Sequence, residues 1–438
     1  MSDPVAESNT FAQRPGITTL PYEIFLLIKS QISSQDRKSL SQTCKALENL
    51  LPVSFPRVFI STNPLDIKAF RGIADDPKLR EQVTEIIWDE SRFTATPDIF
   101  VKEFSGNFTI IRQRAEETEN DDHAIWQKRK EAELTIRNCW GIYDTLSVQQ
   151  NQTMKSGDDE AAFVYGLSRF PALKRVTITP AAHGTLFAPR YPTPTIRSLP
   201  FGFNYAVPRA WPQLKKNLSP IFQPPGRWSK STEEYKEHWH GTRIVLRVLG
   251  QVEHTVSELC FDLGGDKVGL NITMLDQPCV EYDHFVSMLR NSRLSRLDLP
   301  LYVWDGKEEW SNESSGHLYR ALSEATDLIH FSVPTTYTMS YGDAEVQLGN
   351  LLPIEKWPLL QHIGLKCFNV SESFISKYLE SRPSTLRSVE IGLSREEYES
   401  RKWVKLREAM GSDKSVELYF DIDEEKRRYS DFYVRPTP

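Results

Sequence analysis

A short apolar pattern recurs along the chain, in which two apolar residues three positions apart are followed by a third two positions later. It occurs at Val83, Ile86 and Trp88, and such a run is typical of a short buried strand. Because 39% of the residues are apolar, chance alone gives about 26 such triplets, so the pattern by itself carries little weight. Six later windows with this pattern are centred on Val176, Leu259, Leu297, Phe331, Ile363 and Val389.

The spacing of these windows is better evidence than the pattern. The centres of the last five lie 26 to 38 residues apart, and helical apolar stripes fall between them. One strand and one helix per interval predicts an α/β fold of the irregular leucine-rich-repeat type, a curved parallel sheet with outer helices. A doubly wound α/β sheet uses the same elements and is the alternative. The stripes are Tyr282, Phe285, Val286 and Leu289, then Leu318, Ala321, Leu322 and Ala325, then Phe374, Tyr378 and Leu379.

The first fifty residues have a different, purely helical pattern. After a polar leader, residues 1–16, Pro21 suits a first helical position, and Ile24 and Ile28 lie at helical spacing. Leu40 and Cys44 continue a second stripe. Helices of about ten residues are marginal alone, so residues 17–52 should pack as a small module. The sequence from 53 to 438 then forms the repeat domain, beginning with a strand at 55–60, a helix from Pro64 and a strand at 83–88.

Two stretches interrupt the repeats. Residues 112–154 are highly charged and helical in character, and they predict a helical insert containing Trp126, Leu134, Trp140, Tyr143 and Leu146. Between residues 180 and 230 the composition changes again, because ten of the 27 prolines fall between Pro180 and Pro225. Proline cannot sustain a helix or a central strand, so this stretch should be a long loop.

The loop at 180–230 is basic and aromatic. It contains no Asp or Glu, and its seven basic residues give a local charge of about +7. Guanidinium groups bind carboxylate and phosphate, and aromatic rings supply rigid contact area. We expect the loop to lie over the repeats and to recognise an acidic or phosphorylated segment. The residues expected to bind that substrate are Arg190, Arg197, Arg209, Trp211, Arg227 and Trp228.

Two other interpretations of this loop remain. It could be an ordinary insertion whose aromatic side chains pack on the repeats while its charges are solvated. It could also stack single-stranded nucleic acid, although the acidic residues Asp305, Glu308 and Glu309 argue against that if they lie nearby.

Composition and charge narrow the class of protein. The chain has 438 residues and a net charge of −6, which excludes a basic nucleic-acid coat as its global identity. Its five cysteines are far apart and contain no CxxC pair, so neither a disulfide framework nor a zinc site is indicated. No signal-like leader and no apolar run of about 18 residues is found, so we expect a cytoplasmic or nuclear protein without a membrane span.

No enzyme signature is found. Gly264 to Gly269 lacks the spacing of a phosphate-binding loop and should be a turn. His238 and His240 point opposite ways on a helix, so we do not expect them to share a metal ion. We expect both side chains at the surface. Cys44 lies in an apolar stripe, where a thiol is usually inert packing. We expect no catalytic residue, metal or cofactor, and an unrecognised α/β enzyme is a third interpretation.

The N-terminal segment resembles the F-box, the short helical module of ubiquitin-ligase substrate receptors. The residues that carry this resemblance are Leu20-Pro21-Tyr22-Glu23-Ile24, Ile28, Ile32, Asp36, Leu40, Thr43-Cys44-Lys45 and Leu47. The continuation is similar to fungal F-box proteins with degenerate leucine-rich repeats. It is carried by Arg57 to Ser61, Asn63-Pro64, Phe70-Arg71, Ile73 to Asp75 and Trp88-Asp89, and more loosely by Tyr143 to Leu146, Gln149-Gln150, Gly166-Leu167 and Phe170-Pro171.

This resemblance implies a receptor without catalysis of its own. The F-box would bind the adaptor of an SCF complex, and through it the cullin and RING subunits, while the repeats hold a protein substrate. Two positions depart from the motif, Lys29 where a large apolar residue is usual and Arg37 where leucine is usual. An alternative is a repeat scaffold with a vestigial F-box. The positions that match adaptor contact or the packing behind it are Leu20, Pro21, Ile24, Ile28, Leu40 and Cys44.

Overall fold

The computed structural model divides the chain into two compact units. One includes residues 1–55, and the other comprises residues 56–425. Each unit is described separately. The residues that the structure describes are 17, 20–32, 34–50, 55–117, 122–212, 227–265, 268–302, 316–334, 352–366, 382–394 and 417–423.

The small unit contains three short helices, α1 (Tyr22–Gln31), α2 (Ser34–Ser41) and α3 (Lys45–Leu50). Among the described side chains of this unit, Phe25 and Leu47 are the buried apolar ones, and Ile32, Leu40 and Leu50 pack against them. Of the predicted first stripe, Ile24 is exposed and Ile28 is half-buried, so this core uses Phe25, which the stripe did not include. The second stripe is divided between two helices, because the chain turns between Ser41 and Lys45.

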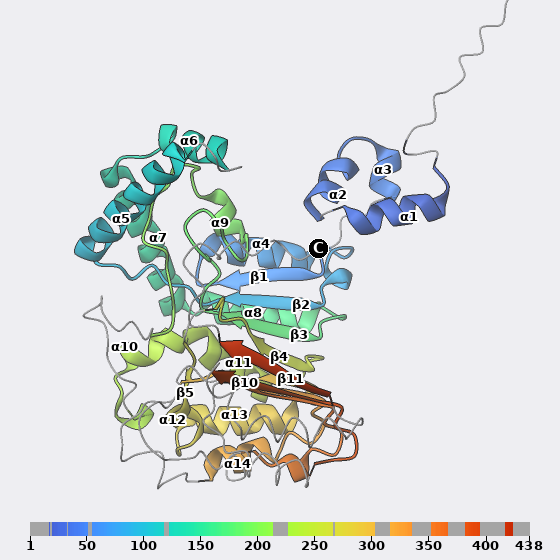
Figure 1. Ribbon diagram of the computed structural model, residues 1–438. Coiled ribbons are helices and arrows are strands. Elements are labelled where there is room, and N and C mark those ends of the chain that lie inside the picture. Colours follow the sequence, from blue (N-terminus) through green and yellow to red (C-terminus); the bar gives the residue numbers. More distant parts are fainter. Residues whose placement is uncertain are drawn as a thin grey trace, which may run out of the picture. The chain divides into compact units, whose positions relative to one another are not determined.

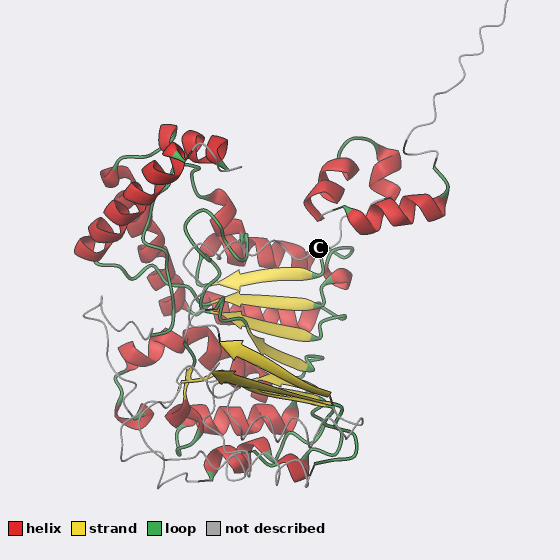
Figure 2. Cartoon of the chain, in the orientation of Figure 1, coloured by secondary structure: helices red, strands yellow, loops and turns green. Residues whose placement is uncertain are grey.

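Parallel strands form the centre of the large unit. Nine of them hydrogen-bond in the order β1-β2-β3-β4-β6-β8-β9-β10-β11, and every described pairing is parallel (Figures 1 and 2). This order follows the sequence. A doubly wound sheet reverses its order at a switch point, so that alternative does not fit these strands. Their bounds are β1 Arg57–Ser61, β2 Glu85–Asp89, β3 Arg175–Thr179, β4 Glu258–Phe261, β6 Arg296–Asp298, β8 His330–Pro334, β9 His362–Lys366, β10 Ser388–Ser394 and β11 Glu417–Asp423.

The seven apolar windows of the sequence lie side by side in this sheet. Their central residues are partners in one continuous register, from Ile86 on β2 through Leu297 on β6 to Val389 on β10. All seven central residues are buried. The even-numbered core positions of β1 to β3 and the odd-numbered ones of β4 to β10 therefore share one face, because strand side chains alternate.

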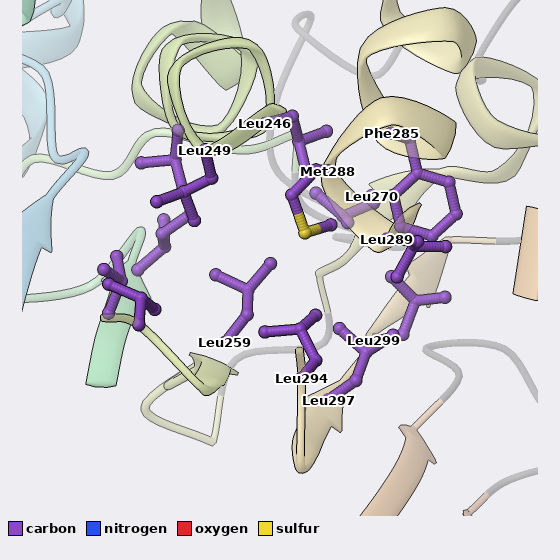
Figure 3. Packing of buried hydrophobic residues seen from close by; sticks show 14 of the residues in the cluster. Leu246, Leu249, Leu259, Leu270, Phe285, Met288, Leu289, Leu294, Leu297 and Leu299 are labelled. Atoms are coloured by element: carbon purple, nitrogen blue, oxygen red, sulfur yellow. The ribbon is translucent and has the colours of Figure 1, made fainter. Parts of the chain in front are cut away.

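Helices cover that apolar face. Buried side chains of α4, α8, α11, α13 and α14 form one cluster with those of the strands. Figure 3 shows part of it, with Leu249 and Phe285 of the helices facing Leu259 and Leu297 of the strands. The helices are α4 Pro64–Asp75, α8 Asp158–Arg169, α11 His240–Gln251, α13 Val280–Asn291 and α14 His317–Leu322.

Two of the three predicted helical stripes are confirmed as α13 and α14. Phe285 and Leu289 are buried on α13, and Leu318, Ala321 and Leu322 are buried on α14. The third stripe, Phe374, Tyr378 and Leu379, lies outside the described residues. The helix expected at Pro64 is α4, in which Asn63 caps the N-terminus by accepting a hydrogen bond from the Leu65 N–H.

The helical insert is longer than predicted. It begins at Pro97, where Thr96 accepts from the Ile99 N–H, and comprises α5 (Pro97–Glu116), α6 (His123–Glu131) and α7 (Ile136–Ser156). The sequence prediction began at 112 because residues 104–111 of α5 contain no charged side chain. The insert has a second core that includes Phe100, Phe104, Cys139 and Tyr143.

The remaining elements are short. Leu270–Asn271 (β5) and Leu301–Tyr302 (β7) pair as a small parallel sheet. The short helices are η2 Arg80–Gln82, α9 Pro194–Ser198, η3 Trp228–Lys230, α10 Glu233–Lys236, η4 Glu237–Trp239, α12 Ile272–Leu275 and η6 Ile354–Lys356. In the described part of the chain, none of the helices has both the length and the apolar character that crossing a bilayer requires.

Leu297 tests the packing of the sheet on the helices. It is fully buried on β6, so Leu297→Ala should lower the free energy of unfolding by about 2–5 kcal/mol through lost burial and a cavity. Urea titration followed by far-UV circular dichroism measures this loss. Leu359, which is 47% exposed, provides the control, since Leu359→Ala should change stability by less than about 0.5 kcal/mol. Equal effects of the two substitutions would contradict the assigned core.

Candidate docking surfaces

The small unit exposes apolar side chains along α1. Leu20, Ile24 and Leu27 lie at helical spacing and are 36%, 45% and 64% exposed, whereas Phe25 on the opposite side is buried. Leu20, Ile24 and Leu27 are not part of the core that the described side chains of this unit form. The exposed row is therefore a candidate docking surface of this unit.

The other predicted adaptor-binding residues occupy varied positions in this unit. Pro21 is the N-cap residue of α1 and is exposed, Ile28 is half-buried, and Leu40 packs in the core. Cys44 is exposed in the turn before α3, so the expectation that it packs within a helical stripe is wrong. The side chains of Lys29 and Arg37 lie outside the described residues.

The sheet face away from the helices, here called the open face, carries a polar row. The register places Arg57, Glu85, Arg175, Glu258 and Arg296 in succession on β1 to β6, so that basic and acidic residues alternate. Arg57 and Glu85 are 2.7 Å apart, and Arg175 and Glu258 are 2.5 Å apart. The row continues with His330, His362 and Ser388 on β8 to β10.

Residues 180–212 lie over the open face at the carboxyl ends of β1 to β4. The Tyr191 ring contacts Phe59 of β1, with centroids 6.3 Å apart. The Tyr191 hydroxyl and the Arg190 guanidinium both donate to Asp262, just after β4, at 2.5 Å. Arg190 and Tyr191 of the loop therefore lie over the carboxyl ends of β1 and β4, as the sequence interpretation expected of the loop.

Two of the predicted substrate-binding residues are structural. Trp211 is 2% exposed and donates its indole N–H to Glu90 at 2.6 Å. Trp228 is fully buried and donates to Glu281 at 2.8 Å. Their rings are inside the large unit and present no surface to a partner. Their indole N–H groups need buried acceptors, and these carboxylates supply them.

The predicted arginines differ in how far they are engaged. Arg190 is paired with Asp262, and Arg209 donates to the carbonyls of Pro208 and Gly184. Arg227 is half-buried. Arg197, in the last turn of α9, is exposed. Of these side chains, Arg197 is the one most open to an anionic partner.

Aromatic side chains of the loop complete the core of the helical insert. Phe203 and Tyr205 stack with centroids 4.5 Å apart and belong to the cluster of Phe100 and Tyr143. The Arg129 guanidinium of α6 lies over the rings of Phe187 and Phe201, 3.8 and 4.0 Å from their centroids. Gly202 permits this approach, because a Cβ there would lie 1.7 Å from the Ala132 carbonyl oxygen. The interpretation of the aromatics as packing residues thus describes most of the loop.

Three carboxyl groups are buried near the ends of the first strands, and two of them bond to segments distant in sequence. Asp66 of α4 accepts from the Thr195 N–H at 2.8 Å, and Glu90 accepts from the Thr242 N–H at 2.7 Å. Asp89 ends β2 and accepts from the Ser91 N–H. Burial raises the pKa of Asp66, and it raises the pKa values of Asp89 and Glu90 to about 7. The Asp66 contact joins α4 to the loop, the Glu90 contact joins the segment after β2 to α11, and the Asp89 contact is local.

These groups carry no recognisable catalytic arrangement. Burial lowers the pKa of His183 to about 3, and its Nδ1 atom lies 3.0 Å from the Tyr205 hydroxyl. His238 and His240, expected at the surface, are half-buried, with His240 2.7 Å from Asp159 and His238 bonded to the Ala210 carbonyl. Among the described side chains, no group of three or more His, Cys, Asp or Glu residues is placed to hold a metal ion.

Comparison with known proteins identifies no relative. Neither a scan against protein-family models nor a search of curated proteins finds a match.

Sequence reasoning missed the polar row of the open face. Its signal is present, because every strand window carries a polar residue directly before its central apolar residue, such as Arg175 before Val176 and His330 before Phe331. What the spacing could not show is that these residues become neighbours. That follows from the register of the strands.

The raised pKa of Asp89 predicts a pH-dependent stability. The carboxyl titrates near 3.8 when exposed and at about 7 when buried, so the folded chain binds its proton more tightly. Its contribution is complete below pH 4 and is lost as the pH rises to 7. Asp89→Asn removes this loss and keeps an acceptor for Ser91. The stability of the variant relative to the natural chain should rise by up to about 1.4 kcal/mol per pH unit between pH 5 and 7.

Urea titrations at pH 5, 6, 7 and 8 measure this difference. Backbone hydrogen bonds from Leu79 and Lys78 lower the pKa of Asp76, so Asp76→Asn should show a difference that is constant over this range. A constant difference for Asp89→Asn as well would contradict the assigned role of burial.

Proposed function

We propose that the protein is the substrate-recognition subunit of an SCF-type cullin–RING ubiquitin ligase. The F-box-like module, residues 17–52, would bind the adaptor, and the leucine-rich-repeat-like unit would hold the protein substrate. The observation that carries this proposal is the exposed apolar row of α1, Leu20, Ile24 and Leu27, on a helical unit separate from the sheet.

Exposed leucine and isoleucine side chains at helical spacing favour a helix-face partner. An apolar row of this kind is costly in water, and burying it against a partner would contribute about 1.5–3 kcal/mol per side chain. The F-box that this segment resembles is likewise a helical module that docks on a partner. The resemblance of Leu20, Pro21 and Ile24 to the motif supports the same surface from an independent direction.

Repeat proteins bind through extended sheet surfaces, which supports the second half of the proposal. Loop residues 190–195 contact β1, α4 and the end of β4. Because the loop occupies this part of the open face, a substrate would bind on the remaining strands. Arg197, exposed on α9, would contact an acidic or phosphorylated segment beside that face.

The mechanism is proximity. Ubiquitin would be transferred by the conjugating enzyme of the complex, and no side chain of this chain would take part in the bond chemistry. Holding a substrate lysine near the conjugating enzyme that carries ubiquitin raises the effective concentration of that lysine. A second candidate function, a repeat scaffold with a vestigial module, is favoured by the departures from the motif at Lys29 and Arg37.

Adaptor binding separates these two candidates. Ile24→Asp places a charge in the exposed row, so it should weaken binding of the purified chain to the SCF adaptor at least about 30-fold in calorimetry, as for an interface hot spot. The paired change Leu20→Ala and Pro21→Ala should weaken it as well. Asn49→Asp, exposed on α3, is the control expected to bind normally. A folded natural chain that does not bind the adaptor would favour the scaffold.

Arg197 tests the expected substrate class. If it contacts phosphate, Arg197→Glu should reduce retention of a phosphopeptide library on the immobilised chain about tenfold, and added salt should reduce it further. Arg293→Glu, exposed after α13, is the matched charge reversal. Equal retention of phosphorylated and unphosphorylated libraries by the natural chain would contradict the assignment.

A further inference from the structure

Two histidines face each other across neighbouring strands of the open face. His330 begins β8 and His362 begins β9, and the parallel register makes them direct partners. Their rings stack with centroids 4.2 Å apart and planes inclined by 13°. Both side chains are partly exposed, so protons can reach them from solvent.

Each ring is held at its outer side by a neighbouring strand. The Nε2 atom of His330 lies 3.4 Å from a carboxylate oxygen of Asp298 on β6. The Nδ1 atom of His362 lies 2.7 Å from the Ser388 hydroxyl on β10. A carboxylate thus lies beside the His330 ring, whereas the hydroxyl beside His362 carries no charge.

The charged groups around the pair act in both directions. Burial, His330 and Arg296 lower the pKa of His362, whereas Glu390 on β10 and Asp298 raise it. Cys260 on β4 also bonds to Asp298, and burial raises the pKa of its thiol to about 12, so the thiol remains neutral. Among the described residues, the group stacked on each ring is thus the other histidine.

We propose that His330 and His362 form one proton-sensitive unit on the open face. The stack accepts one proton, and a second proton forces the rings apart because two cations repel each other when they lie face to face at 4.2 Å. The inference does not rest on the proposed function.

The consequence is a change of charge on the part of the open face away from loop residues 190–195. In the stacked state the pair carries at most one positive charge, and Asp298 beside it also pairs with Arg296 at 2.9 Å. After the second proton binds, two cations stand beside Arg296. Mild acidification thus converts a stretch with little net charge into a positive one, and any partner on this face meets a different potential.

Histidine titration in the full chain tests the proposal. Histidine labelled with ¹³C at Cε1 gives one resonance per ring, and the variants His330→Gln and His362→Gln assign the two signals. The natural chain should titrate in two steps about one pH unit or more apart. In His330→Gln, the midpoint of His362 should rise. In His362→Gln, His330 should titrate in a single step, because no second ring is then coupled to it.

The controls separate coupling from general perturbation. His284→Gln, on α13, should leave both midpoints unchanged. His330→Phe keeps a flat ring for stacking but binds no proton, so it replaces His330→Gln if that variant loses its circular dichroism spectrum. EDTA in every sample excludes metal binding as the cause. An unchanged His362 midpoint in the folded His330 variant would overturn the proposal.

Discussion

The fold depends on one register shared by successive parallel strands. Each strand contributes apolar side chains at the same level, so the helices meet a continuous apolar surface although the individual strands are short. A strand such as β6, three residues long, has no independent stability. It persists because strands on both sides pair with it and because Leu297 is buried beneath α13. Stability in such an array is carried by contacts between neighbouring units.

This register also determines the chemistry of the opposite face. Since side chains alternate along a strand, fixing Val176 and Phe331 toward the helices fixes Arg175 and His330 on the open face. Residues separated by 30 or more positions in the sequence thereby become direct neighbours. The alternating charges of β1 to β6 compensate one another, and the stacked histidines of β8 and β9 follow from the same alignment.

Buried carboxyl groups fasten the insertions to this frame. Burying Asp66, Asp89 and Glu90 is unfavourable, which is why their pKa values are raised. Hydrogen bonds from Thr195, Trp211 and Thr242 offset part of that cost. They form only when each segment places its donor group next to the carboxyl group. The polar cluster therefore contributes to the precise placement of the loop, while the apolar side chains supply most of the stabilisation.

The sequence by itself determined most strands of the large sheet, their order and several of the helices. Apolar windows at intervals of 26 to 38 residues predicted the strands, and helical stripes predicted α13 and α14, because periodicity reports which side of an element is buried. It also placed the loop between Pro180 and Pro225, where proline interrupts regular structure. The exposed row of α1 could be expected from the excess of apolar positions over the small core. Tertiary structure alone decided which aromatic residues of the loop are buried, since Trp211 depends on an acceptor 121 positions earlier, at Glu90. It likewise decided that His330 and His362 meet, because pairing between strands is a property of register rather than of local sequence.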